Sequence, residues 1–160
     1  PCPVVNPKIS SHSPEFLKDL STVGLVYLFA KYLERLEIVE ADPLWADLAA
    51  LGTVADVSPL SPLNARLVKR GLFFLNRGES SSLGLEILLK NLRLEDLNEN
   101  DIAFRLAPRL NAFGRMERAR RGLKFLITQN GEEAQKLFRE MEELNTRRRE
   151  LTERFTREVI

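Results

Sequence analysis

The sequence is poor in the residue types that cross-link small proteins or bind metals. Among 160 residues it has one cysteine, Cys2, and one histidine, His12. A single cysteine excludes an internal disulfide and gives no cysteine pair for a metal, which suits a reducing cytoplasm. His12 stands between two serines, and we interpret it as an exposed turn residue. Any metal chemistry would therefore rest on carboxylates.

Long apolar runs and a strong net charge are also missing. The longest apolar run, residues 23–30, is far shorter than the roughly 20 residues that span a bilayer, so we expect no membrane association. Lysine and arginine total 24 against 23 acidic residues, so net charge alone draws the protein to no polyanion. The charges are unevenly spread, however: arginines gather after residue 104, and acids gather between residues 132 and 143.

The remaining composition indicates one globular, mainly α-helical domain with at most one short strand near the amino terminus. Apolar periodicity and capping residues predict the following helices: 14–20, 21–38, 42–51, 63–75, 82–89, 98 or 100 to 106, 119–127 and 132–160. Residues 1–7 read as the tail of a buried strand with neighbours upstream. We therefore interpret the sequence as a piece of a longer protein, with a processed amino terminus as the alternative.

Two of the expected helices carry distinctive patterns. Residues 21–38 are apolar on most faces, which is typical of a buried helix. Residues 132–160 lack glycine and proline and predict a rod about 40 Å long with one apolar stripe. Such a rod would project toward a partner, another domain or a second copy. A coiled-coil dimer is the alternative, weakened by Arg148 at a seam position.

The segment 104–116 joins two helical patterns and contains both Pro108 and Gly114. Proline and glycine interrupt helices, so we predict a kinked helix end and then a tight loop. This loop would offer Asn111, Gly114 and Arg115 to an anion. The alternative is an ordinary joint between helices with surface arginines.

A second candidate is Asp56, which follows a glycine and stands among apolar residues. We expect its carboxylate to be buried, which is costly unless it meets a cation or several donors. It would then cap a helix or pair with an arginine. Alternatively, it would bind Mg²⁺ or Mn²⁺, which prefer oxygen ligands.

Both segments resemble a known family. Residues 51–60, followed by residues 64–71, resemble the fourth motif of the RecJ-type single-stranded-DNA exonucleases in the DHH phosphoesterase superfamily. Residues 104–116 resemble the same family's loop before its long connecting helix. Residues 4–7 and 20–25 are similar to the segments that follow the Asp-His-His motif.

The resemblance implies a hydrolase that removes nucleotides from the 5′ end of single-stranded DNA, in DNA repair and recombination, with two Mn²⁺ or Mg²⁺ ions. By motif, Asp56 would be a catalytic metal ligand, and Arg109, Asn111 and Arg115 would contact phosphates. Arg105 and Arg118 are secondary candidates. Residues 1–130 would form the carboxyl-terminal, helical part of the α/β DHH catalytic domain.

In the same scheme, residues 131–160 would be the helix that connects to the remaining domains, with self-association through this helix as a further possibility.

Departures from the family pattern limit this reading. The upstream aspartate motifs and the Asp-His-His triplet are absent, and Phe113 replaces a small residue. Asp56 alone cannot hold two metal ions, so we expect the isolated chain to be inactive. The alternative function is a non-enzymatic, helical nucleic-acid-binding or replication-scaffold module.

Overall fold

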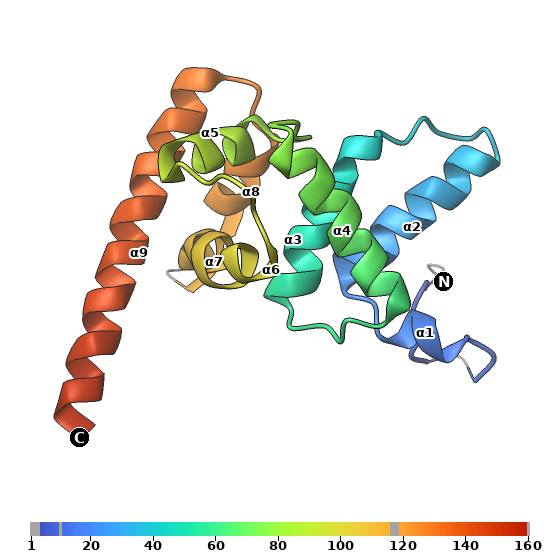
Figure 1. Cartoon of the computed structure of the whole chain (residues 1–160), viewed down its shortest axis with the longest axis horizontal. Coiled ribbons are helices and arrows are strands. Elements are labelled where there is room, and N and C mark those ends of the chain that lie inside the picture. Colours follow the sequence, from blue (N-terminus) through green and yellow to red (C-terminus); the bar gives the residue numbers. More distant parts are fainter. Residues whose placement is uncertain (1–3, 10, 116–118, 160) are drawn as a thin grey trace. The chain divides into compact units, whose positions relative to one another are not determined.

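The computed structural model describes residues 4–9, 11–115 and 119–159 (Figure 1). All regular secondary structure in these ranges is helical, which confirms the mainly α fold with a long carboxyl-terminal helix. Val4 and Val5 are exposed and lie outside any strand. The chain divides into two compact units, Pro1–Arg77 and Gly78–Ile160.

The first unit is built on two helices that pack closely. Its elements are α1 (Glu15–Lys18), α2 (Thr22–Arg35), the 3₁₀ turn η1 (Pro43–Trp45), α3 (Ala46–Ala55) and α4 (Pro62–Asn76). A Cβ added at Gly71 of α4 would lie 2.4 Å from the Ala46 carbonyl oxygen and from the Ala50 Cβ. Only glycine therefore allows α3 and α4 to approach this closely.

Side-chain caps mark the starts of α2 and η1. The Ser21 hydroxyl accepts a hydrogen bond from the Gly24 amide and lies 3.1 Å from the buried Thr53 hydroxyl of α3. Asp42 accepts from the Leu44 amide at 2.8 Å and starts η1. Because the Ser21 hydroxyl contacts both helices, it links the start of α2 to the middle of α3.

The prediction that residues 21–38 form a buried helix is wrong for the described residues. In α2 only Gly24 and Tyr27 are buried, whereas Val26, Phe29 and Tyr32 are exposed. Leu17, Leu25 and Leu28 add partial cover to the core around Leu20, Tyr27, Ala46, Ala49 and Leu67. The physical reason is geometric: one side of α2 meets this core, and no described element covers the other.

In the second unit, three helices pack against the first half of a long helix. Its elements are α5 (Leu83–Leu92), α6 (Glu99–Asp101), the π-helical turn η2 (Ile102–Leu106), α7 (Ala107–Arg115), α8 (Ala119–Ile127) and α9 (Gly131–Val159). Ser82 caps α5 through the Leu85 amide, as the sequence predicted. Of the two candidates for the next cap, Asn98 fills it, in a capping box with Asp101.

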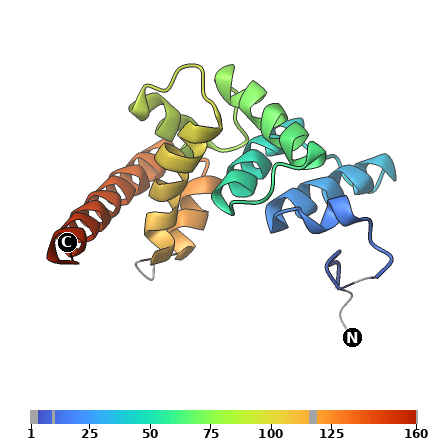
Figure 2. The same ribbon diagram turned by 60° about the horizontal axis from the view of Figure 1, so that its bottom comes forward.

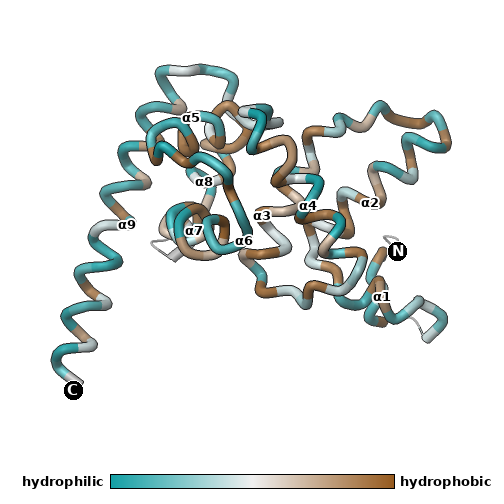
Figure 3. Tube along the Cα trace, viewed as in Figure 1, coloured by the Kyte–Doolittle hydropathy of each residue, from teal (hydrophilic) through white to brown (hydrophobic). Residues whose placement is uncertain are grey.

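The long helix α9 changes character along its length. Its first half contributes buried apolar side chains that face α5, α7 and α8: Ala134, Leu137, Phe138, Met141 and Leu144. From residue 149 to residue 158 every side chain is exposed, including Leu151 and Phe155. This second half extends past α7 and α8 (Figure 2) and is mostly hydrophilic (Figure 3).

Candidate functional site

Helix α3 ends in a strained turn that carries Asp56. The Ser58 amide donates to the Thr53 carbonyl and the Val57 amide to the Val54 carbonyl, each at 3.1 Å. These two bonds define a Schellman motif, whose left-handed residue is usually glycine. Here Val57 takes that place with φ of 53°, an unfavourable conformation for a β-branched residue. Backbone strain of this kind is concentrated at functional sites.

The structure corrects the expected burial of Asp56. Asp56 is the C-cap residue that follows the last residue of α3, Ala55, and it is exposed. Within the described residues its carboxylate has neither an ion pair nor a hydrogen bond. The fully buried carboxylate of this helix is Asp47, which accepts from the Leu48 amide. Asp56 therefore presents an unpaired carboxylate to solvent, as an incoming cation would require.

Asn64 holds the segment that follows Asp56. It is 0% exposed, and its Nδ2 donates to the Pro59 carbonyl at 2.7 Å and to the Asp19 carbonyl at 3.0 Å. Its Oδ1 is buried without a hydrogen-bond partner in the described structure. The sequence reasoning used Asn64 only as part of a motif and missed this role. Its position eight residues after Asp56, at the start of α4, was the available signal.

The segment 104–116 differs from its prediction. Helices α6, η2 and α7 follow one another without a break from Glu99 to Arg115, so Asn111 and Gly114 lie in a helix rather than in a tight loop. Just before Pro108, the Ala107 amide bonds to the Ile102 carbonyl, five residues back. This wider turn accommodates a proline that lacks an N–H and crowds the preceding turn. Met116, the last residue of the predicted segment, lies outside the described residues.

Two of the predicted phosphate ligands, Arg105 and Arg109, lie on this helix and are engaged within the protein. The Arg109 Nε donates to the Glu142 carboxylate of α9 at 2.7 Å, and its Nη1 donates to the Arg105 carbonyl at 2.7 Å. Arg105 pairs with Asp101 at 3.2 Å. The Arg109 side chain is only 18% exposed, so in this structure it joins α7 to α9.

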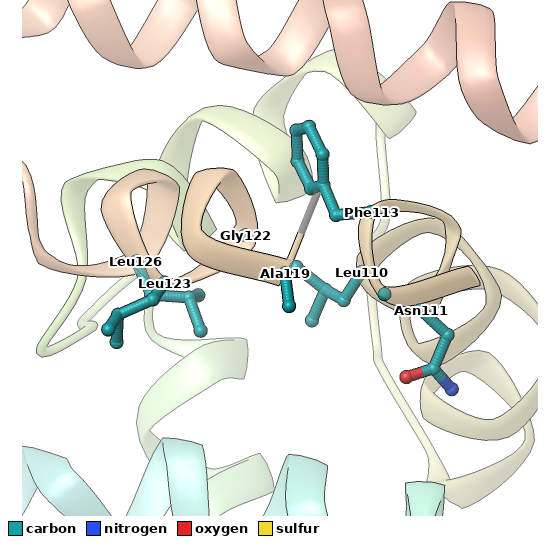
Figure 4. Close-up of a pocket in the computed structure, with 8 residues that line it drawn as sticks. Leu110, Asn111, Phe113, Ala119, Gly122, Leu123 and Leu126 are labelled. Carbon is teal, nitrogen blue, oxygen red and sulfur yellow. The ribbon is translucent and has the colours of Figure 1, made fainter. Parts of the chain in front are cut away.

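Asn111 is exposed and lines an open pocket of about 190 Å³ between α7 and α8 (Figure 4). The other lining residues are Leu110, Phe113, Gly114, Ala119, Gly122, Leu123 and Leu126. The Phe113 ring points toward α9, away from Leu110, and is fully buried. Phe113 thus belongs to the core of the unit, and Asn111 is the one polar side chain of the lining.

Two predicted residues have no described side chain. The side chain of Arg115 lies outside the described part of the structure, and so does the whole of Arg118. Asp56 belongs to the first unit, whereas Arg105, Arg109 and Asn111 belong to the second. Of these residues, the structure brings Arg105 and Arg109 together.

The acidic cluster of the sequence neutralises part of the basic run. Arg121 of α8 pairs with Glu140 at 3.1 Å, and Lys124 pairs with Glu133. The bond from Lys124, followed by one from the Thr128 hydroxyl, lowers the pKa of Glu133 below its usual 4.5. These α8 cations therefore bind α9, and their contribution to the surface potential is largely cancelled.

The described ranges contain no cluster of three or more histidine, cysteine or acidic side chains suited to a metal. Nor does any helix in those ranges have the length and apolarity needed to cross a bilayer. Among the described residues, the sequence-predicted metal ligand, Asp56, is therefore not part of such a cluster.

Similarity to known proteins extends over nearly the whole chain. It is 38% identical to the single-stranded-DNA-specific exonuclease RecJ of Thermus thermophilus over 159 residues, which cover 98% of this chain and 23% of that protein. The Bacillus subtilis RecJ is 35% identical, with 98% of this chain and 19% of that protein covered. No protein-family model matches.

Solved structures agree with the sequence comparison. A crystal structure of exonuclease RecJ bound to manganese superposes with a TM-score of 0.78 and 35% identity, covering 97% of this chain and 39% of that one. A Thermus thermophilus RecJ in complex with Mg²⁺ gives a TM-score of 0.73 and 40% identity, covering 82% of this chain and 21% of that one.

Sequence and fold thus relate this chain to exonucleases whose solved structures include complexes with Mg²⁺ or Mn²⁺. It belongs to the RecJ exonucleases and spans about a fifth to a quarter of the length of the curated relatives it matches.

Proposed function

We propose that this chain forms part of the catalytic region of a metal-dependent exonuclease that removes nucleotides from the 5′ end of single-stranded DNA, in DNA repair and recombination. The observation that carries the proposal is the exposed, unpaired carboxylate of Asp56 on a strained helix end. Relatives over the same residues are single-stranded-DNA-specific exonucleases, and related structures contain Mg²⁺ or Mn²⁺. A cytoplasmic location stays a prediction.

Asp56 fits one place in a divalent-metal site. Its carboxylate is exposed and lacks a partner among the described residues, and carboxylate oxygens are preferred ligands of Mg²⁺ and Mn²⁺. When bound, two such ions would activate water and stabilise the attacking and leaving oxygens. The described residues supply no ligand cluster, so the other ligands would come from further residues of the protein, and the isolated chain would be inactive.

In the proposal, the phosphate contacts come from α7 and the residues after it. Asn111 offers an exposed amide, and Arg115 stands at the end of α7. Arg109 would contact phosphate only with guanidinium donors not already used by Glu142 and by the Arg105 carbonyl. A guanidinium has five N–H donors, so a bond to an anion in addition is feasible.

The proposed division of the chain follows the same scheme. Residues 1–130 would belong to the catalytic domain, and residues 131–160 would connect it to the remaining domains. The exposed second half of α9 supports this role, because Leu151 and Phe155 have no cover in the described structure. Self-association through that half stays an alternative.

The test measures release of nucleotides from a 5′-labelled single strand by the full-length protein with Mn²⁺ or Mg²⁺. Asp56→Asn should lower the rate at least about 100-fold, because a metal ligand contributes several kcal/mol to the transition state. Asp96→Asn is the matched control, since Asp96 is also exposed and lies outside the proposed site. Retained activity in Asp56→Asn would refute the metal-ligand assignment.

The same protein preparation also distinguishes the proposed exonuclease from the alternative, a non-enzymatic binding module. A non-enzymatic module would bind single-stranded DNA with a steep salt dependence and release no nucleotide with either metal. Release of 5′ nucleotides by the wild type, lost in Asp56→Asn, would exclude that alternative.

A further inference from the structure

Helix α4 presents a basic and aromatic stripe that no residue of the proposed catalytic site explains. At 100° of rotation per residue, Arg66, Lys69, Arg70, Phe73 and Arg77 fall within an arc of about 100°. All five residues are exposed. The opposite side of the helix packs into the unit through Leu67, Val68, Gly71, Leu72 and Leu75. The stripe is therefore the solvent face of an amphipathic helix whose buried face is complete.

Three cations of this stripe have no acidic partner among the described residues. Helix α4 contains no acidic residue, and Arg66, Lys69 and Arg70 form no ion pair with the described residues. This contrasts with α8, where both Arg121 and Lys124 are paired with acids of α9. Three unpaired cations on one helix face repel one another, and a bound polyanion would remove that cost.

An exposed aromatic ring stands among the cations. Phe73 is 57% exposed, and the Arg77 guanidinium carbon lies 5.3 Å from the centre of its ring. Arg70 lies in the same way over Phe74, at 5.7 Å. Aromatic rings and guanidinium planes are the surfaces on which unstacked bases pack.

We propose that the Arg66–Arg77 face of α4 binds single-stranded DNA as a second contact, separate from the phosphate ligands of α7. This inference rests on the proposed function. Cations and a ring in one stripe match a strand whose phosphates and base faces are both accessible. The stripe is about 17 Å long at 1.5 Å per residue, the span of roughly three to five nucleotides at 3.4 Å or more each.

Other anionic partners fit this face less well. A duplex hides the faces of its bases inside the stack, so Phe73 would gain nothing from it. A membrane surface requires a broad apolar face, whereas Phe73 is the only exposed apolar side chain of the stripe. An acidic peptide has charge but no bases.

The experiment measures fluorescence anisotropy of a labelled 20-nucleotide oligo(dT) bound to the full-length protein, in EDTA so that no DNA is cleaved. Arg66→Gln with Lys69→Gln should weaken binding roughly 10-fold in 0.1 M salt and make the slope of log K against log salt less steep by about 1.4. Phe73→Ala should weaken binding at least about 5-fold with little change in that slope.

The matched control is Lys8→Gln with Arg35→Gln, which removes the same charge from exposed positions of the same unit. It should stay within about twofold of the wild type, and circular dichroism should show equal helix content in all variants. Unchanged affinity and slope in the α4 variants would overturn the inference while leaving the proposed function intact.

Two further outcomes are informative. If the wild type fails to bind oligo(dT) in EDTA, the inference is wrong, whereas the proposed function is judged separately by nucleotide release with Mn²⁺ or Mg²⁺. If polyglutamate of equal charge competes as well as oligo(dT), the face binds acidic peptides and the assignment to single-stranded DNA is overturned. Asp56→Asn should bind oligo(dT) like the wild type, which separates this contact from hydrolysis.

Discussion

The basic helices of the two units use their charged residues in opposite ways. In the first unit, α3 and α4 meet through close backbone packing at Gly71, and Asp56 and the cations of α4 have no ion-pair partners among the described residues. In the second unit, arginines and a lysine of α7 and α8 are paired with Glu133, Glu140 and Glu142 of α9.

This difference shows why a basic run in a sequence is a poor guide to ligand binding by itself. The arginine-rich stretch after residue 104 attracts attention, yet much of its charge holds helices together. The shorter basic pattern of α4 has no acid within the helix, and Arg66, Lys69 and Arg70 keep their charge available. Charge that is free to bind an anion is charge without an internal partner.

The largest expected effect is a loss of folding stability. It tests the close approach of a glycine to backbone atoms, which occurs once in each unit at the positions below. Gly71→Ala places a Cβ 2.4 Å from the Ala46 oxygen, and Gly84→Ala places one 2.0 Å from the Phe125 oxygen. Because backbone atoms cannot move aside cheaply, each change should lower the free energy of unfolding by about 3 kcal/mol or more. Urea denaturation followed by circular dichroism measures it.

Gly114→Ala is the matched control, since nothing lies within 4 Å of an added Cβ. It should raise stability by about 0.5–1 kcal/mol, because alanine favours the helix. A comparable loss in all three variants would contradict close packing as the cause of the first two results, because Gly114 has no neighbour for an added Cβ to meet.

The next effect concerns the first unit alone. Asn64→Leu removes both hydrogen bonds to the Asp19 and Pro59 carbonyls and should cost about 2 kcal/mol. Hydrogen exchange should also speed up in residues 56–61, the segment that Asn64 holds. Asn111→Leu, at an exposed position, should change stability by less than about 0.5 kcal/mol. Equal losses of stability in Asn64→Leu and Asn111→Leu would contradict the proposal that Asn64 holds residues 56–61 in place.

A smaller effect tests the ion pairs of the second unit. A double-mutant cycle with Arg109→Met and Glu142→Gln should give a coupling of about 0.5–1 kcal/mol, because the pair is only partly exposed. High salt should reduce it. The exposed pair Arg154–Glu158 on α9 should give a coupling near zero, and Arg66→Gln in the first unit should leave stability unchanged. A coupling energy equal to that of the exposed pair would contradict the interpretation that the Arg109–Glu142 pair joins α7 to α9.

The smallest effect is a pH dependence. The bonds from Lys124 and Thr128 lower the pKa of Glu133 below 4.5 in the folded state. A lowered carboxyl pKa contributes stability that is present above the unfolded value of about 4.5 and is lost as pH falls through the folded value. Glu133→Gln should therefore flatten the acid limb of a plot of urea midpoint against pH. Glu132→Gln, one residue away without an ion pair in the described structure, should leave that limb unchanged.

Local chemistry made some features predictable from sequence. Ser82 and the choice of Asn98 or Asn100 as caps depend on a few neighbouring residues, and the long helix follows from the absence of glycine and proline. The two motif segments were sufficient to indicate the RecJ family, which the comparisons confirm.

Other features depended on where a helix ends, on residues distant in sequence or on hydrogen-bond register, and the sequence did not predict them. Asp56 is exposed because α3 ends there, which its apolar neighbours do not reveal. The pairing of Arg109 with Glu142 spans 33 residues. Pro108 was expected to interrupt the helix. Instead, the backbone hydrogen bonds before it widen into a π turn, and no local sequence pattern predicts that change of register. The site assignments for Asp56, Asn111 and Arg115 stay predictions.

The π turn at η2 also bears on how this helix tolerates insertions and deletions. Since a π turn holds one residue more than an α turn, deleting one residue within 102–106 would restore a regular helix. That repair would rotate every earlier residue relative to α7 by about 100°. The Asn98 capping box would then face new neighbours, while Arg109 kept Glu142. Loss of one codon here would thus make the helix more regular but move the residues before the deletion away from their present contacts.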